Sequence, residues 1–136
     1  MRTRFGQFIL SSSQPIPLPV GVFAGLTITG ASVQAAVTDP QVQAEAVIAM
    51  NERFQTPILQ TAMDLSAEAE VFGCEIRMFE DEIPTVIGRK VTSQQDLDQL
   101  HSPSIGDGRT SVHLRTAEKL VAYANEQPVL GGVIGP

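Results

Sequence analysis

The sequence predicts an α/β fold with a largely parallel sheet, and two observations carry this prediction. Short apolar segments alternate with segments of helical pattern, which is the order expected of parallel strands connected by helices. The last apolar segment, residues 128–136, has no polar face, as is usual for parallel strands buried on both sides. We therefore expect one domain at residues 18–136, preceded by a loosely structured lead-in at residues 1–17.

The first elements are predicted from apolar runs and from residues that start helices. Residues 18–25 are apolar and bounded by Pro and Gly, which predicts a buried strand, and residues 26–37 are expected to form a loop. Asp39 and Pro40 predict a helix start, because Asp is a good N-cap acceptor and Pro suits the first helical position. This helix should continue to about Phe54.

The middle of the chain predicts a strand, a short helix and a hairpin. Residues 56–63 are expected to form the second strand, and residues 65–72 a helix that ends before Gly73. Residues 74–78 alternate between apolar and charged side chains, which predicts a strand with one solvated face. Residues 86–91 should return as its hairpin partner.

The last third of the chain predicts two helices before the final strand. Ser93 is expected to cap a small helix in which Leu97 faces inward. Thr110 should cap a longer helix that runs to about Glu126, with Val121 on its buried side.

Composition and charge exclude several classes of function. The net charge is −6 and the Lys and Arg residues are scattered, whereas nucleic-acid binding draws on clustered basic residues. No apolar run approaches the length of a membrane-spanning helix, and the apolar stretch after Arg4 is too short for a signal peptide. Cys74 is the single cysteine, so the chain has no internal disulfide. We expect a cytoplasmic protein that binds neither nucleic acid nor a membrane.

Acidic residues after the second predicted strand are the first candidates for a site. Asp64 lies at the carboxyl end of that strand, where barrel enzymes build their active sites, but Asp is also a good N-cap for the helix that follows. Glu68 and Glu70 lie in the first turns of this helix, where acids interact favourably with the helix N-terminus. Asp64 can serve both as a catalytic residue and as a helix N-cap. Of Glu68 and Glu70, only one side chain is expected to face the site.

Other chemistry-bearing residues favour structural roles. His101 and His113 are expected at the surface, since no Cys or third His accompanies them at ligand spacing. Cys74 is expected to be a small core residue rather than a nucleophile. The glycines fit neither a dinucleotide fingerprint nor a phosphate loop, so nucleotide binding is excluded. No metal site is predicted within this chain.

Residues 64–76 resemble the uroporphyrinogen decarboxylase superfamily, which also contains the cobalamin-dependent methyltransferases. Neighbouring segments at residues 38–40, 91–100 and 131–136 resemble the family in the same order. The resemblance implies the N-terminal part of a (β/α)8 TIM-type barrel with a β-hairpin excursion. A complete barrel usually needs about 200–250 residues, so we expect the chain to be a truncated barrel, inactive by itself. Its exposed strands could pair with a second copy in a homodimer.

Two branches of the family imply different chemistry. In the decarboxylases of tetrapyrrole biosynthesis, an Asp at the position of Asp64 organises the pyrrole nitrogens, and an Arg-rich loop binds the carboxylates of the porphyrin precursor. Asp64 and Gly73 have the family's spacing, but the loop at residues 25–32 contains neither Arg nor Lys. That departure argues against decarboxylation, because a substrate with many carboxylates requires guanidinium partners.

The methyltransferase branch resembles the chain through residues 68–70 and 72–73. It implies transfer of a methyl group from a methylcorrinoid, free or on a corrinoid protein, to a thiol. The branch activates the thiol with zinc, held by His and Cys ligands expected beyond residue 136, so this chain carries no cofactor of its own. The residues expected at the mouth are the catalytic Asp64 and the substrate-binding Thr27, Thr29, Ser66, Glu68 and Gly135. The alternatives are a decarboxylase and a non-catalytic domain that self-associates.

Overall fold

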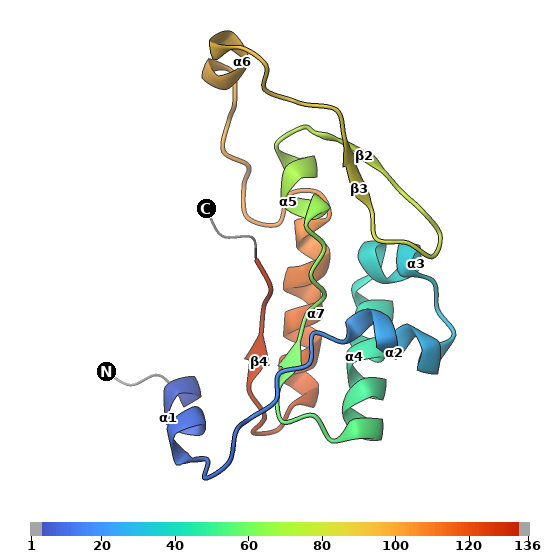
Figure 1. The fold of residues 1–136 in the computed structure, drawn as a ribbon, viewed down its shortest axis with the longest axis vertical. Coiled ribbons are helices and arrows are strands. Elements are labelled where there is room, and N and C mark those ends of the chain that lie inside the picture. Colours follow the sequence, from blue (N-terminus) through green and yellow to red (C-terminus); the bar gives the residue numbers. More distant parts are fainter. Residues whose placement is uncertain (1–3, 134–136) are drawn as a thin grey trace.

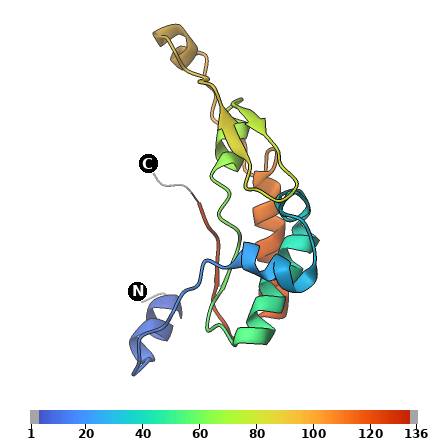
Figure 2. The same cartoon turned by 45° about the vertical axis from the view of Figure 1, so that its right-hand side comes forward.

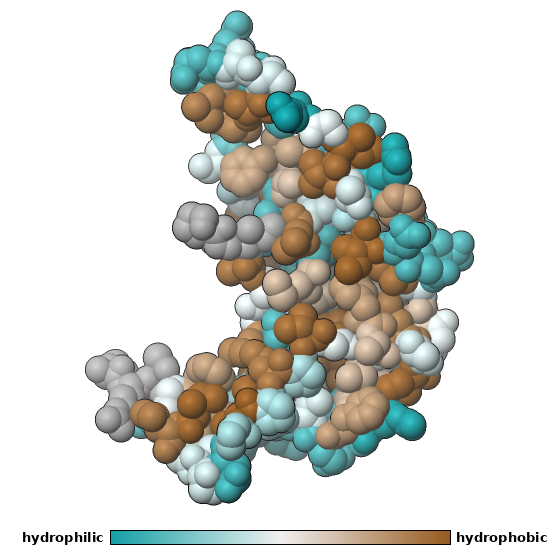
Figure 3. Space-filling view, in the orientation of Figure 1, coloured by the Kyte–Doolittle hydropathy of each residue, from teal (hydrophilic) through white to brown (hydrophobic). Residues whose placement is uncertain are grey.

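The computed structural model describes residues 4–133 of the chain. The helices and strands follow in the order α1 (Arg4–Ser11), α2 (Val22–Thr29), α3 (Val33–Thr38), α4 (Pro40–Phe54), β1 (Leu59–Gln60), α5 (Ser66–Val71), β2 (Glu75–Arg77), β3 (Thr85–Ile87), α6 (Gln94–Asp98), α7 (Thr110–Tyr123) and β4 (Val129–Leu130). Figure 1 shows them arranged along a curved molecule, and the space-filling view in Figure 3 shows apolar residues along its concave edge.

Helices α4 and α7 form the centre of the core together with α2 and α3. Leu120 of α7 and Leu59 of β1 are almost fully buried in the same apolar cluster as Val47 of α4. The predicted start of α4 is confirmed: Asp39 accepts a hydrogen bond from the Gln41 N–H at 2.7 Å. Burial of one apolar side of each helix is the main stabilising contribution in such a layer.

Strands β1 and β4 pair in parallel, as the sequence predicted for strands separated by helices. Leu59 pairs with Val129 and Gln60 with Leu130. Figures 1 and 2 both show α4 and α7 on one side of this pair. The side chains of β4 are therefore only half-buried within the described residues, and not buried on both faces as its apolar sequence predicted.

A buried amide ties the sheet to the helices. Gln43 of α4 is fully buried, its Nε2 donates to the Ala36 carbonyl of α3 at 2.9 Å, and its Oε1 accepts from the Ala62 N–H at 3.1 Å. Both ends of the side chain are thus satisfied, which a buried polar group requires. Through its bond to Ala62, Gln43 holds the segment that follows β1 against α4.

The strand predicted at residues 18–25 and the loop predicted at residues 26–37 are wrong. Val22–Thr29 forms helix α2, and α3 follows with Ser32 as its N-cap, accepting from Ala35 N at 3.1 Å. The reason is packing against α4: a Cβ on Gly25 would lie 2.2 Å from the Ala46 carbonyl oxygen. A short apolar run fits a strand or a buried helix equally well, and here close helix contact decides.

Between α5 and α7, residues 75–98 form a projection that we call the excursion, drawn at the upper end of Figure 1. Helix α5 ends before it with Gly73 at φ +85, and the Cys74 N–H donates to the Ala69 carbonyl at 3.0 Å, as in a Schellman motif. In the excursion β2 and β3 pair antiparallel. The Glu80 carbonyl at its turn accepts from the Gln34 N–H of α3 at 2.9 Å, which anchors it to the helices.

Helix α6 at the end of the excursion is held by a capping box. Ser93 accepts from the Asp96 N–H, and the Asp96 carboxylate accepts from the Ser93 N–H. Hydrogen bonds from Thr92 and Ser93 lower the pKa of Asp96 to about 2. The cap was predicted, but the inward position of Leu97 is wrong, because Leu97 is 51% exposed and α6 buries no residue.

Helix α7 differs from its prediction at both ends. It is preceded by Arg109 and not capped by the Thr110 side chain, and it ends at Tyr123. Val121 is 64% exposed, and the buried side is formed by Val112, Thr116 and Leu120.

The expected lead-in contains helix α1, which faces a hollow of about 580 Å³ beside β4 and the end of α7. Among the described residues, no helix is long and apolar enough to cross a membrane.

Candidate functional site

The ends of the two parallel strands lie next to each other at one edge of the sheet. Asp64 follows β1, and Gly132 follows β4, where its N–H donates to the Thr61 hydroxyl at 2.9 Å. Carboxyl ends of parallel strands are where α/β proteins commonly place ligands. Helices α5 and α7 begin close to this edge and bring further polar side chains to it.

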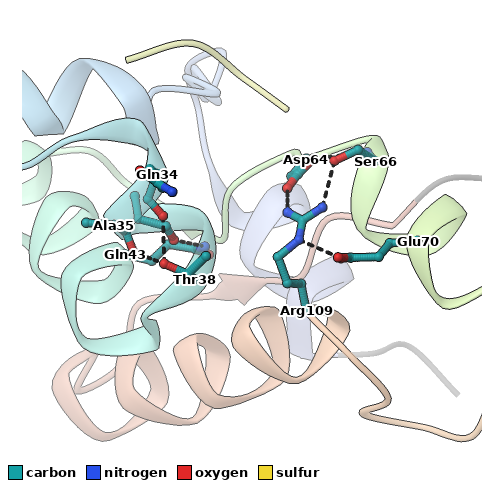
Figure 4. Close-up of polar contacts among 9 residues, drawn as sticks. Gln34, Ala35, Thr38, Gln43, Asp64, Ser66, Glu70 and Arg109 are labelled. Atoms are coloured by element: carbon teal, nitrogen blue, oxygen red, sulfur yellow. Dashed lines mark hydrogen bonds and ion pairs between the residues drawn. The ribbon is translucent and has the colours of Figure 1, made fainter. Parts of the chain in front are cut away.

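Arg109 joins the start of α5 to the start of α7, as Figure 4 shows. Its Nη1 forms an ion pair with Asp64 Oδ2, its Nη2 donates to the Ser66 hydroxyl at 2.8 Å, and its Nε donates to Glu70 Oε2 at 2.6 Å. The planar guanidinium suits such simultaneous contacts, which a Lys ammonium would not reproduce. We call Asp64, Ser66, Glu70 and Arg109 the Arg109 cluster.

The Asp64 carboxylate is occupied within this cluster. Its Oδ1 accepts from the Ser66 N–H at 3.0 Å and from the Ser66 hydroxyl at 2.6 Å, and its Oδ2 is paired with Arg109. The side chain is fully buried and that of Arg109 is 11% exposed. Asp64 therefore holds Ser66, the first residue of α5, although the N-cap position itself is Leu65.

Together with Asp64, Glu68 and His113 line one small pocket at this edge. Glu68 and His113 also line a cavity of about 310 Å³ whose walls are largely apolar. Burial lowers the pKa of the His113 imidazole, and the charge of Arg109 acts in the same direction, whereas Asp64 and Glu68 act against this shift. The expectation that His113 is a surface residue is thus wrong, while His101 is exposed as predicted.

The structure separates the other predicted binding residues from this edge. Thr27 and Thr29 are exposed residues of helix α2, not of a loop at the mouth, because that segment packs on α4 as a helix. Neither of them lines the cavities that contain Asp64 or Glu68. Gly135 lies outside the described residues. Of the predicted set, Asp64, Ser66 and Glu68 are brought together.

No cluster of three or more His, Cys, Asp or Glu residues with metal-binding geometry occurs in the part of the chain that the structure describes. Cys74, the single cysteine, is half-buried at the start of the excursion. The described residues therefore do not fit a zinc site, and none of them is assigned as a zinc ligand.

Sequence reasoning missed Arg109, which immediately precedes the helix predicted to start at Thr110. A signal existed in the spacing: Arg109 and His113 are four residues apart and would share one face of a helix. A buried carboxylate at Asp64 also requires a cationic partner. The sequence alone offers no way to select that partner from the scattered basic residues.

Comparisons with known proteins agree with this architecture. A family model described as Uroporphyrinogen decarboxylase (URO-D) matches residues 23–136. The chain belongs to the uroporphyrinogen decarboxylase family. The family match begins within α2 and includes both parallel strands, α5 with its Asp64, and α7 with its Arg109.

Two relatives of this uroporphyrinogen decarboxylase family member carry the name Methylcobamide:CoM methyltransferase MtbA. The protein from Methanosarcina mazei is 36% identical and the one from Methanosarcina acetivorans 34% identical, each over 80 residues. These matches cover 57% of this chain and 24% of each relative, so the chain is matched to about a quarter of their length.

A solved structure, a methyltransferase from Methanosarcina mazei, superposes with a TM-score of 0.81 at 24% sequence identity. The superposition covers 99% of this chain and 42% of the methyltransferase. This likeness confirms the α/β fold class and shows that the chain has the fold of part of a larger protein.

Proposed function

We propose that the chain is the front part of a (β/α)8 barrel that transfers a methyl group from a methylcorrinoid to a thiol. The observation that carries the proposal is that both curated relatives, at 36% and 34% identity, are named as methylcobamide:CoM methyltransferases. The thiol and the methylcorrinoid are substrates in this reaction, and the rest of the barrel lies outside the residues described here.

The charges near the strand ends support methyl transfer over decarboxylation. Arg109 lies at this edge, and its guanidinium already contacts Asp64 and Glu70. Residues 25–32, where the resemblance places the Arg-rich loop of a decarboxylase, contain no Lys or Arg and largely belong to helix α2. Among the described residues, Arg109 is therefore not free to serve as the bidentate partner that a substrate with many carboxylates needs.

Within this proposal, the predicted site residues have different roles. Asp64 and Ser66 position α5 through the Arg109 cluster, and Glu68 lies on the side of α5 that faces the cavity. Asp64 then influences the reaction by holding α5 in place and by balancing the charge of Arg109. Zinc is the metal of this branch, but the described residues supply no ligand set for it, so no step is assigned to it.

A chimera tests the proposal. Residues 23–136 of this chain replace the equivalent segment of the Methanosarcina mazei methyltransferase, and the product is assayed with methylcobalamin and a thiol. We expect formation of the methyl thioether, followed by mass spectrometry, while the isolated chain shows no turnover. A chimera that folds with the parent's thermal stability but produces no thioether would contradict the proposal, as would one that decarboxylates uroporphyrinogen instead.

Self-association is a second candidate, favoured by one observation. Within residues 4–133, β1 and β4 pair only with each other, so each strand has an outer edge without a strand partner. Unpaired edges are templates for pairing with another chain. Size-exclusion chromatography of the isolated chain decides: a dimer supports pairing between copies, and a monomer at all concentrations excludes it.

A further inference from the structure

The contacts of Arg109 hold helix α5 at more than one point. From its place at the N-cap of α7, the guanidinium contacts Asp64 just before α5, Ser66 at the first residue of α5 and Glu70 one turn later (Figure 4). Ser66 and Glu70 are four residues apart, so they lie on the same side of the helix. Contacts at both of these positions prevent α5 from rotating about its axis, which a single contact would not do.

Helix α5 depends on such contacts for its orientation. It has six residues, and its N-cap residue, Leu65, forms no side-chain capping hydrogen bond. So short a helix is not stable without tertiary contacts. The fully buried Asp64 carboxylate and the 11% exposed Arg109 side chain form their ion pair away from water, where the pair is not weakened by solvent screening. Arg109 therefore sets the rotation of α5 relative to the start of α7.

The rotation of α5 decides where the Glu68 carboxylate lies. Glu68 is two residues from both Ser66 and Glu70, so it does not share the side of α5 that Arg109 contacts. It lines one small pocket with Asp64 and His113 at the carboxyl ends of the parallel strands. Burial lowers the pKa of His113, and the charge of Glu68 opposes this shift. The Glu68 carboxylate is thus close enough to His113 to influence its titration.

We propose that Arg109 is a positioning residue for the methyl transfer, and that it holds the Glu68 carboxylate beside His113 at the carboxyl ends of the parallel strands. Nε, Nη1 and Nη2 of Arg109 each already have a partner, so Arg109 acts through α5 and not by touching a substrate. The role in turnover rests on the proposed function, whereas the placement of Glu68 can be measured without turnover.

NMR titration of the histidine rings in the isolated chain tests the placement. Glu68→Gln removes a charge that raises the pKa of His113, so it should lower the midpoint of the His113 titration. Arg109→Lys keeps a positive charge but loses the planar fork, so in this background Glu68→Gln should lower the midpoint less. The exposed His101 is the internal reference and should titrate alike in every variant. An equal shift in both backgrounds would overturn the proposal.

Kinetics of the chimera test the role in turnover. Arg109→Lys should lower kcat for thioether formation about ten- to hundredfold, because small misplacements of reacting groups have effects of this size, and should change KM less than about twofold. Glu70→Ala removes one contact and leaves the ion pair with Asp64, so its loss of kcat should be smaller and its fold retained. Arg89→Lys, at an exposed position of the excursion, is the control and should leave kcat unchanged.

A double substitution separates positioning from a general loss of structure. If Arg109 acts through Glu68, then Arg109→Lys should lower kcat little further once Glu68→Gln has removed the carboxylate that it positions. Losses that multiply as for independent sites would overturn the proposal, because a purely structural defect lowers kcat in either background.

These outcomes are separate from the test of the proposed function. A chimera that is inactive without any of these substitutions would remove methyl transfer, and the NMR titration would still decide whether Arg109 places Glu68. An active chimera whose kcat is unchanged by Arg109→Lys would keep methyl transfer and remove Arg109 as a positioning residue.

Discussion

The helical layer with its two parallel strands and the excursion are stabilised in different ways. In the layer, Leu59 and Leu120 are at most 1% exposed and contact residues far away in the sequence. In the excursion, Ile83 and Leu97 are 47% and 51% exposed, and the hydrogen bonds of α6 come from its own capping residues. The layer therefore depends on non-local burial, whereas the excursion depends mainly on contacts within itself and on the hydrogen bond from Gln34 to Glu80.

This difference implies that the two regions should respond differently to the same type of substitution. A change in the layer removes contacts on which several elements depend, so it should lower the global free energy of unfolding. A change in the excursion should alter local opening more than global stability. Four matched pairs of substitutions test these expectations, from the largest expected effect to the smallest; the first and third pairs compare the layer with the excursion, and the other two compare a packed position with an open one.

The largest effect is expected from Arg109→Gln. Removing one partner of a buried ion pair leaves an uncompensated charge, here Asp64, and costs about 3–5 kcal/mol. Urea unfolding followed by circular dichroism measures this loss. The control is Arg89→Gln in the excursion, where the Arg side chain is exposed and the midpoint should not move. Equal effects of the two variants would contradict the comparison.

Gly25→Ala is expected to have the next largest effect. The new Cβ would overlap the backbone of Ala46, so α2 must move away from α4, at a cost of about 1–3 kcal/mol. Gly131→Ala is the matched control, because a Cβ at Gly131 meets no atom within 4 Å. Thermal unfolding of both variants is the measurement, and a Gly25→Ala protein as stable as the control would show that α2 does not pack on α4 as described.

A pair of helix caps gives a smaller contrast. Asp39→Ala removes the N-cap of α4 and should lower global stability by about 1 kcal/mol. Asp96→Ala removes the capping box of α6 and should speed amide exchange in α6 without changing the midpoint of unfolding. Hydrogen exchange with denaturant unfolding distinguishes these outcomes, and a global loss in Asp96→Ala would mean that the excursion supports the layer.

The smallest expected effect is a pH dependence from His113. Burial lowers its pKa in the folded chain, so the unfolded chain binds a proton first as the pH falls below about 6.5. Its contribution to stability is complete above that pH and is lost as the pH falls toward the folded pKa. His113→Phe should flatten the stability profile in this window, and His101→Phe should not. A parallel decline in all three proteins would contradict the buried position of the ring.

Elements whose ends carry local signals could be predicted from the sequence. Asp39 with Pro40, Gly73 and Ser93 each fix a helix end through contacts within a few residues, and the structure shows all three helix ends. The segment at residues 18–29 was predicted wrongly because its conformation depends on Ala46 of a later helix. No local pattern carries that information.

The candidate site could also be predicted only where its residues are close together in the sequence. Asp64, Ser66 and Glu68 follow one another along the chain, so the end of β1 located all three. Arg109 and His113 reach the same place only through the packing of α7, and Thr27 and Thr29 were placed there by assuming a loop. Residues supplied by a distant element require the fold to be known first.

The pairing of Leu59 with Val129 has a consequence for the order of folding. These residues lie far apart in the sequence, so β1 and β4 can meet only after the intervening chain has been brought back on itself, and such non-local contacts slow folding. The entropy of closing a loop grows only slowly with its length. The excursion lies inside this connection, so insertions there should change the folding rate little, whereas weakening α7, which carries the chain back to β1, should slow it.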